Sequence, residues 1–302
     1  MLRYARNDGG WRLAAAVFAS LLLSSAQASD QRCVVDDIEH TVCLPKPAER
    51  IIALSPGATE LLFAAGAGHK VIAAVTFSDF PEEAKALPRI GSYNRFDMEA
   101  IVAAQPDLII AWKEGNPREQ VEQLRELGFP VYHGDQRDFL DIASTIQRLG
   151  ILAGTELSAN TEATRFLDGI AHYRDQFQTK APVRTFYQVW VNPLMTANRN
   201  HFIGHAITLC GGDNIFADLD RLTPRIGVEA VLAENPEVII AGGMGEDDPS
   251  WLNAWRPYSN IVAVQKDNLF FVPPSTLQRP SPRLLDGIDL LCQHLETARG
   301  RR

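Results

Sequence analysis

The 302-residue sequence has little cysteine and no excess of positive charge. Lys and Arg number 29 against 37 Asp and Glu, and the formal net charge is -8. No basic patch of the kind that binds phosphate backbones occurs, so nucleic acid is not expected as a partner. Beyond residue 28 no apolar run is long enough to span a bilayer as a helix. With 46% hydrophobic residues, the chain is globular and large enough for one large domain or two ordinary ones.

Motifs for catalysis are also missing. Ser55 in "SPGATE" precedes a predicted helix without a G-x-S-x-G motif, and "AGGMGEDDP" lacks the lysine and spacing of a phosphate-binding loop. His201 and His205 are four residues apart and could share one helix face. The H-E-x-x-H glutamate is absent and no third ligand is indicated, so no metal site is expected. A metal-dependent hydrolase using these histidines is the least favoured function, and no enzymatic activity is predicted.

The N-terminus has the pattern of a secretory signal peptide, with a positive flank, an apolar core and a small-x-small site. These features are Arg3, Arg6 and Arg12, the apolar run 13–23, and "AQA" at 26–28. A run of 11 residues is too short for a spanning helix, which disfavours a membrane anchor. We therefore predict a signal peptide over residues 1–28, cleaved after Ala28, and a mature chain with a formal net charge of -10.

All four cysteines follow this segment. An even number of cysteines in an oxidising compartment suggests two disulfides. Cys33 and Cys43 bracket "VVDDIEHTV", which predicts a small stapled hairpin within residues 29–48. Cys210 and Cys292 would then pair within the C-terminal half. Neither pair has C-x-x-C spacing, so structural roles are favoured over redox or zinc chemistry.

One segment occurs twice. "MEAIVAAQPDLIIA" at 98–111 and "VEAVLAENPEVIIA" at 228–241 match at an offset of 130 residues. Each begins with helical spacing of apolar residues, meets a proline, and continues as an apolar run of strand length. Continuous apolar strands of this kind are typical of parallel sheets covered on both faces.

The repeat, with further alternating strands and helices, predicts two similar α/β lobes with mostly parallel sheets, over residues 49–153 and 182–302. Residues 154–181 lie between the lobes and keep one apolar helix face without proline between 155 and 179. One rigid helix of about 23 residues, roughly 35 Å long, is therefore predicted as the connector. A ligand cleft is expected between the lobes.

Several segments in order resemble a known family: "RIIALSPGATELLFAAG", "FSDFP", "MEAIVAAQPDLIIAWKEGN", "CGGDNIF" and "SPRLL". The chain resembles the cobalamin-binding members of the helical-backbone periplasmic substrate-binding proteins of ABC importers, over most of residues 50–295. The resemblance implies a periplasmic protein, monomeric when free, that captures cobalamin or a related corrinoid and delivers it to an ABC importer permease. The corrinoid would be the transported ligand, and no cofactor is implied.

The resemblance also implies a set of ligand-binding residues. Aromatic faces suit a large, partly flat ring with amide arms, and a few polar groups would fix its orientation. The implied residues are Phe77, Tyr93, Trp112, Trp190, Met195 and Arg279. Trp251 and Trp255 are expected instead on a solvent-facing helix packed on its own lobe.

The sequence departs from that family at four of the expected ligand positions. Phe77 and Tyr93 stand where Tyr and Trp are expected, Thr223 where a tryptophan is expected, and Gln278 where an acid is expected. These changes favour a pocket that is wider or more polar on the second lobe. A related or incomplete corrinoid is therefore an alternative ligand.

Glu99 and Glu229 occupy equivalent positions in the repeat. The resemblance implies that such a pair docks into arginine pockets on the two permease subunits, one carboxylate for each lobe. Complementing a helix dipole is the simpler role for a first-turn glutamate, and the 130-residue equivalence favours docking. A haem or ferric-siderophore receptor of the same fold is the alternative function, with Tyr93 as the candidate axial ligand for haem.

Overall fold

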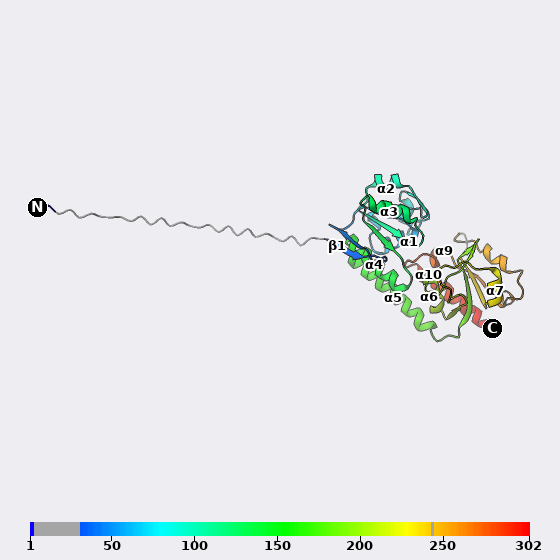
Figure 1. Cartoon of the computed structure of the whole chain (residues 1–302). Helices are drawn as coiled ribbons and strands as arrows, with labels where there is room; N and C mark the ends of the chain where they lie inside the picture. Colours follow the sequence, from blue (N-terminus) through cyan, green and yellow to red (C-terminus); the bar gives the residue numbers. More distant parts are fainter. Residues whose placement is uncertain (3–30, 243–244) are drawn as a thin grey trace.

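The computed structural model describes residues 1–2, 31–242 and 245–302. Figure 1 shows two lobes that lie side by side, with one long helix running past both. Residues 3–28 of the predicted signal peptide and its cleavage point lie outside the described residues. Within the described part of the chain, no helix is long and apolar enough to cross a membrane.

The described chain begins with a disulfide-closed hairpin. Strands β1 (Arg32–Val35) and β2 (Thr41–Leu44) pair antiparallel, with Cys33 opposite Cys43. The predicted bridge between these two cysteines is present, and their Cα atoms are 4.1 Å apart. The hairpin lies against helix α4 (Phe139–Ala153) of the first lobe (Figure 1).

The first lobe is built on a four-stranded parallel sheet in the order β4-β3-β7-β8. Its strands are β3 (Ile51–Ala53), β4 (Val71–Ala74), β7 (Leu108–Trp112) and β8 (Val131–Gly134). The helices between them are α1 (Pro56–Ala64), α2 (Met98–Ala104) and α3 (Arg118–Glu126), with the short turns η1 (Gly68–Lys70) and η2 (Glu82–Ala86). A small hairpin, β5 (Gly91–Ser92) with β6 (Arg95–Phe96), precedes α2. The apolar runs predicted as buried strands thus form the sheet.

The second lobe repeats this topology with a parallel sheet in the order β12-β9-β13-β14. Its strands are β9 (Val183–Gln188), β12 (Gly212–Asn214), β13 (Val238–Ala241) and β14 (Leu269–Phe271). Around them lie α6 (Phe202–Leu209), α7 (Val228–Glu234), η3 (Ser250–Trp255), α8 (Val262–Gln265), α9 (Pro274–Leu277) and α10 (Leu284–Gly300). The hairpin of β10 (Trp190–Val191) and β11 (Leu194–Met195) follows β9. In both sheets the strand second in sequence is an edge strand beside the first, so the two lobes share one topology.

The equivalence of the lobes extends to individual hydrogen bonds. Gln105 ends α2 and Asn235 ends α7, both in the left-handed conformation at φ 46° and 45°. Arg50 donates from Nη2 to the Ala104 carbonyl at the end of α2, and Arg184 donates in the same way to Glu234 at the end of α7, both at 2.6 Å. A cationic side chain at a helix C-terminus satisfies a free carbonyl and complements the helix dipole. The same hydrogen bond, from an arginine to the carbonyl at the helix C-terminus, therefore holds both copies of the repeat.

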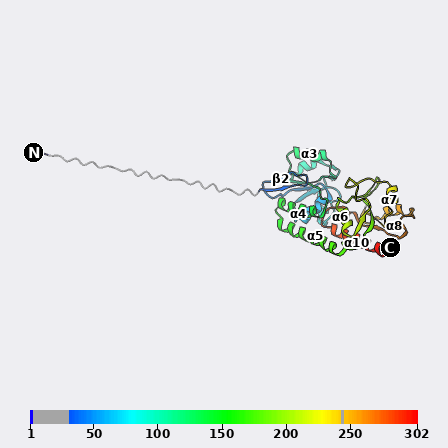
Figure 2. The same cartoon turned by 60° about the horizontal axis from the view of Figure 1, so that its bottom comes forward.

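The connector is helix α5 (Glu156–Phe177), 22 residues long, which agrees with the single rigid helix predicted between the lobes. It follows α4 after a tight turn at Gly154, whose φ is 70°. A Cβ at Gly150 would meet the Ala159 side chain at 2.3 Å, so the small residues let α4 and α5 approach closely. Figure 2 shows the two helices side by side with α10 near the end of α5. Buried residues from both lobes and from α5 form one continuous apolar cluster.

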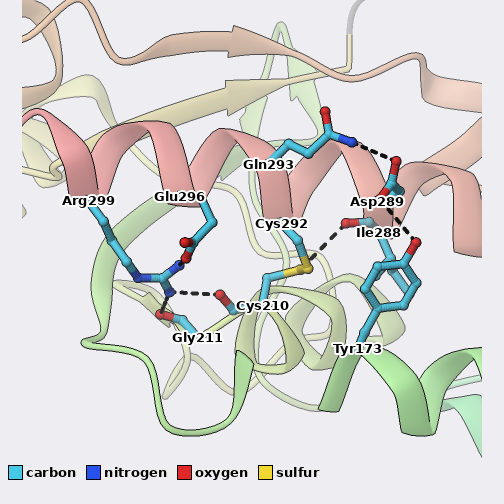
Figure 3. Close-up of a disulfide and its surroundings, with 9 residues drawn as sticks. All are labelled: Tyr173, Cys210, Gly211, Ile288, Asp289, Cys292, Gln293, Glu296 and Arg299. Atoms are coloured by element: carbon cyan, nitrogen blue, oxygen red, sulfur yellow. Dashed lines mark hydrogen bonds and ion pairs between the residues drawn. A yellow bond between two sulfur atoms is a disulfide. The ribbon is translucent and has the colours of Figure 1, made fainter. Parts of the chain in front are cut away.

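The second disulfide, Cys210–Cys292, joins the end of α6 to the middle of α10, as predicted. Figure 3 shows Arg299 of α10 donating to the carbonyl oxygens of Cys210 and Gly211, each at 2.8 Å. Tyr173 of α5 reaches α10 by donating to Asp289 at 3.2 Å. These bonds tie α5, α6 and α10 together beneath the second sheet. The fold class predicted from the sequence, two parallel α/β lobes on one long helix, is confirmed.

Candidate ligand-binding cleft

A cleft of about 580 Å³ lies between the lobes, where first-lobe strands end and α1 begins. Ligands of open parallel sheets bind at the carboxyl ends of the strands, and Ala111, Trp112 and Gly134 occupy that edge here. Five of the six predicted ligand residues line the cleft: Phe77, Tyr93, Trp112, Trp190 and Arg279. Others on its wall are Ser55, Pro56, Leu61, Gln136, Thr145, Glu246, Ser275 and Gln278.

A second hollow, of about 920 Å³, lies on the other side of α1 against α5 and the start of α10. Its walls carry Phe63, Phe80, Arg165 and Arg283, and none of the predicted ligand residues. The smaller cleft is the better ligand site because it joins aromatic faces to a few convergent polar groups.

The first lobe supplies an aromatic wall. Phe77 is 71% exposed and has a φ of 66°, an uncommon conformation for a bulky residue. Tyr93 is 40% exposed, and its ring centroid lies 5.9 Å from that of Trp112. Core packing does not account for rings this exposed, and an outlying backbone at such a place is typical of functional sites. The uncommon backbone conformation of Phe77 and the exposed rings of Phe77 and Tyr93 therefore indicate aromatic surface that serves the cleft.

The loop that carries Phe77 is held from both sides. The Thr59 hydroxyl of α1 donates to Ser78 Oγ at 3.0 Å. Arg89 Nη2 donates to the Ser78 carbonyl at 2.8 Å and to that of Ala84 at 3.1 Å. Ser78 is buried while its neighbour Phe77 points outward, so the exposed ring stands on a fixed base.

Asn116 holds the main chain at the other two aromatic residues of this wall, Trp112 and Tyr93. Its Oδ1 accepts from the Trp112 backbone N–H at 2.6 Å. Its Nδ2 donates to the carbonyls of Leu54 and Tyr93, at 2.9 and 2.8 Å. One side chain thus joins the ends of β3 and β7 to the hairpin that carries Tyr93. Asn116 belongs to the "AWKEGN" segment, yet sequence reasoning gave it no role.

The second lobe supplies Trp190, which is 39% exposed and meets Trp251 edge-on at 5.6 Å. As expected, Trp251 and Trp255 belong to a surface helix packed on its own lobe: Asn253 and Ala254 of η3 are exposed, and both tryptophan rings are buried in the core of the second lobe. Met195 does not line the cleft. It pairs with Trp190 across the β10–β11 hairpin and forms a backbone bridge to Arg225, and only Trp190 of the pair is part of the cleft lining.

Arg279 closes the inner end of the cleft and joins the lobes. Its Nη1 lies 2.8 Å from Glu60 Oε1 and 2.7 Å from Asp79 Oδ1. Glu60 lies on α1, is 3% exposed, and also accepts from Ser281 and Arg283. Burial raises the pKa of the Glu60 carboxyl, against the hydrogen bonds from Ser281 and Arg279, which lower it. The contact is a crossing point at which second-lobe donors meet a first-lobe carboxylate.

The charge of the cleft is nearly balanced. Among the described residues that line it, the acidic and basic side chains are those of Asp79, Glu246 and Arg279. Arg279 is already paired with two carboxylates, and Glu246 accepts from Ser275 at 2.5 Å. A negatively charged ligand would therefore meet no unpaired cation on this part of the wall. A neutral, polar ligand needs no counter-ion, so the lack of an unpaired cation would not disfavour its binding.

Gln278, which replaces the acid expected here, is engaged within its own lobe. Its Nε2 donates to the Tyr187 hydroxyl at 3.2 Å and the Val189 carbonyl at 3.4 Å. Tyr187 is fully buried, and burial raises the pKa of its hydroxyl. Thr223, the other departure on this lobe, does not line the cleft.

The histidine pair has structural surroundings. His201 precedes α6, and its Nδ1 accepts from the Ile203 backbone N–H at 3.1 Å. Burial, and next the charge of His205, lowers the pKa of His201 to about 4. The His205 ring packs edge-on against Phe139 of the first lobe, 6.1 Å away. No group of three or more potential metal ligands occurs within residues 1–2, 31–242 and 245–302.

Comparison with known proteins gives the family. A family model described as periplasmic binding protein matches residues 51–276, about three quarters of the chain. The chain belongs to the periplasmic binding protein family. The Vitamin B12-binding protein of Vibrio cholerae serotype O1 is 35% identical over 254 residues, which cover 84% of this chain and 91% of the relative.

Solved structures agree. The crystal structure of the periplasmic Vitamin B12 binding protein BtuF of Vibrio cholerae has a TM-score of 0.77 at 35% identity, covering 84% of this chain and 98% of that one. The periplasmic heme-binding protein RhuT from Roseiflexus sp. RS-1 has a TM-score of 0.72 at 24% identity, covering 83% and 99%. The second match shows the shared fold alone. These relatives are named as binding proteins, which agrees with a periplasmic binding protein built around a cleft.

Proposed function

We propose that this protein captures cobalamin or a related corrinoid in the periplasm and delivers it to the permease of an ABC importer. The observation that carries the proposal is the cleft itself, with exposed aromatic rings on both lobes and a nearly neutral wall. The 35% identity to a Vitamin B12-binding protein supports the same ligand class.

The chemistry of the wall suits a corrinoid. A corrin ring presents a broad, partly flat apolar face, and Phe77, Tyr93 and Trp190 offer rigid apolar area for it at low entropic cost. The ring is edged with carboxamide arms, which need hydrogen-bond partners more than counter-ions. Met195 is not included in the proposed contact set because it lies outside the cleft lining.

The alternative ligands of this fold fit less well. Haem and ferric siderophores are usually anionic, and Arg279, the cation on the described cleft wall, is already paired with Glu60 and Asp79. Separating such a buried pair to bind a carboxylate would cost several kcal/mol. Tyr93 is exposed enough to reach a haem iron, which keeps haem as the second candidate. A metal-dependent hydrolase is disfavoured because His201 caps α6 through Nδ1.

Glu99 and Glu229 are the proposed permease anchors. Each is the exposed second residue of a seven-residue helix, one on each lobe. Both helices end in a carbonyl held by an arginine, so the two carboxylates stand on equivalent supports. Two equivalent anchors suit a permease made of two equivalent subunits. Export by the predicted signal peptide, with cleavage after Ala28, would bring the protein to the compartment where such a permease receives it.

The test is a calorimetric titration of purified residues 29–302 with cyanocobalamin, followed in parallel by the cobalamin absorbance bands. We expect saturable one-to-one binding with a Kd near or below micromolar. Haemin and a ferric hydroxamate serve as competitors, and neither should displace the corrinoid at equal concentration. Absence of binding by cyanocobalamin and cobinamide, with binding of haemin, would replace the proposed ligand by haem.

A further inference from the structure

The amide of Gln136 has an unusual arrangement beside the cleft. Gln136 is 9% exposed and lines the cleft just beyond the end of β8. Its Nε2 lies 3.1 Å from Asp37 Oδ2 and 3.0 Å from Thr145 Oγ1. A primary amide has two N–H donors, so both are used. Its Oε1 has no hydrogen-bond partner among the described residues, and this is the atom left for the cleft.

The orientation of that amide is imposed from outside the lobe. Asp37 belongs to the turn of the N-terminal hairpin, and its carboxylate also accepts from the Asp135 N–H at 2.7 Å and from Arg148 at 2.5 Å. A carboxylate that accepts from three donors has no hydrogen to offer. The nitrogen of Gln136 must therefore face Asp37, and a flipped amide would set two acceptors against each other.

The hairpin is itself held firmly. Asp36 accepts from the backbone N–H groups of Ile38 and His40 within its turn and from that of His133 on β8. The Cys33–Cys43 bridge closes the two strands behind that turn. Asp37 therefore reaches Gln136 from a fixed position, although the two residues are 99 apart in sequence.

We propose that Gln136 is a specificity-determining residue whose carbonyl oxygen accepts a hydrogen bond from a carboxamide N–H of the ligand, and that Asp37 is its positioning residue. This inference rests on the proposed function, since it assumes a corrinoid in the cleft. A locked acceptor favours a primary amide arm and repels a carboxylate in the same place. It adds to the nearly neutral wall a directional reason for the cleft to reject acidic ligands.

The test combines protein variants with altered ligands. Affinities for cyanocobalamin and for its separate monocarboxylic acids, in each of which one peripheral carboxamide is hydrolysed, are measured by calorimetry. In the unmodified protein, we expect one isomer to bind at least tenfold more weakly than cyanocobalamin. Gln136→Ala should weaken cyanocobalamin binding by roughly five- to tenfold, as for loss of one hydrogen bond, and should abolish discrimination against that isomer alone.

Asp37 is tested by non-additivity, which a purely structural role would not produce. Asp37→Ala should lower cyanocobalamin affinity in the unmodified protein and cause no further loss in the Gln136→Ala background. If Asp37→Ala does not fold, Thr145→Val removes the other acceptor of the Gln136 amide and takes its place. Gln293→Ala, on the exposed side of α10, is the matched control and should change neither affinity nor discrimination.

The outcomes separate the two proposals. Unchanged cyanocobalamin affinity in Gln136→Ala, or discrimination retained against every isomer, would overturn the role of Gln136 and leave the proposed function standing. Additive losses for Asp37 and Gln136 would overturn the positioning role. Failure of the unmodified protein to bind cyanocobalamin would overturn the proposed function and this inference with it.

Discussion

Replacing Phe77 by alanine should produce the largest loss of affinity among the cleft aromatics. A phenylalanine side chain offers on the order of 200 Å² for burial, and Phe77 is 71% exposed. A ligand that covers it therefore removes about 140 Å² of apolar surface from water, which at about 25 cal/mol per Å² is about 3.5 kcal/mol. Side-chain ordering on binding reduces that figure, so we expect a loss of about 2–3 kcal/mol, or roughly 30- to 150-fold in Kd.

Two matched variants make the reasoning refutable. Phe77→Gly should lose the same affinity as Phe77→Ala. It should also be at least as stable to urea as Phe77→Ala, because glycine adopts a φ of 66° without steric cost. Phe80 is 43% exposed in the same loop, lies under Arg283 at 4.1 Å, and lines the other hollow. Phe80→Ala should leave cobalamin affinity within twofold. Calorimetric titrations in which Phe80→Ala costs as much as Phe77→Ala would show that the loop, rather than ring contact, governs affinity.

Two further predictions concern docking and acid stability. The double variant Glu99→Lys with Glu229→Lys should stop transport in reconstituted vesicles while ligand affinity stays the same. The control Glu119→Lys, at an exposed first-turn position on α3, should support normal transport. Uptake by the double variant would refute the docking role. Because the folded-state pKa of His201 is about 4 against an ordinary 6.5, its neutral ring contributes stability that is complete above pH 6.5 and is lost as the pH falls toward 4. The free energy of unfolding in urea is measured at pH 7 and at pH 4.5 for the unmodified protein and for His201→Asn, which keeps a cap for Ile203. Its decrease between the two pH values should be about 2–3 kcal/mol smaller in His201→Asn. Equal decreases in the two proteins would contradict this prediction.

The sequence predicted those parts of the fold whose residues signal their own structure. The runs at 108–112 and 238–241 are continuous and apolar, and Pro106 and Pro236 mark where the preceding helices end. Strand β12 was not foreseen because Gly212–Asn214 contains three residues and no apolar side chain. Helix α4 was placed within the first lobe but was not predicted as a helix, although the capping box at Asp138 marks its start.

The candidate site was foreseen only where single residues carry the signal. Phe77, Tyr93, Trp112, Trp190 and Arg279 were named from the family resemblance of the segments that carry them, and the structure brings them to one cleft. Their contact with the ligand stays a prediction.

Gln136 and Asn116 were not named because their importance lies in hydrogen bonds to partners far away in sequence, Asp37 and Leu54 among them. The family resemblance also placed Met195 at the cleft, and the cleft lining does not include it.

The apolar cluster that runs through both lobes and α5 has a consequence for the autonomy of the halves. Each lobe has an apolar cluster of its own, but α1, α4, α6 and α10 all bury residues in the cluster that the lobes share. Cutting the chain at Gly154 would divide the shared cluster and leave each fragment with a wide apolar surface exposed to water. The two sheets therefore share a topology, and the two lobes also share one part of the protein interior.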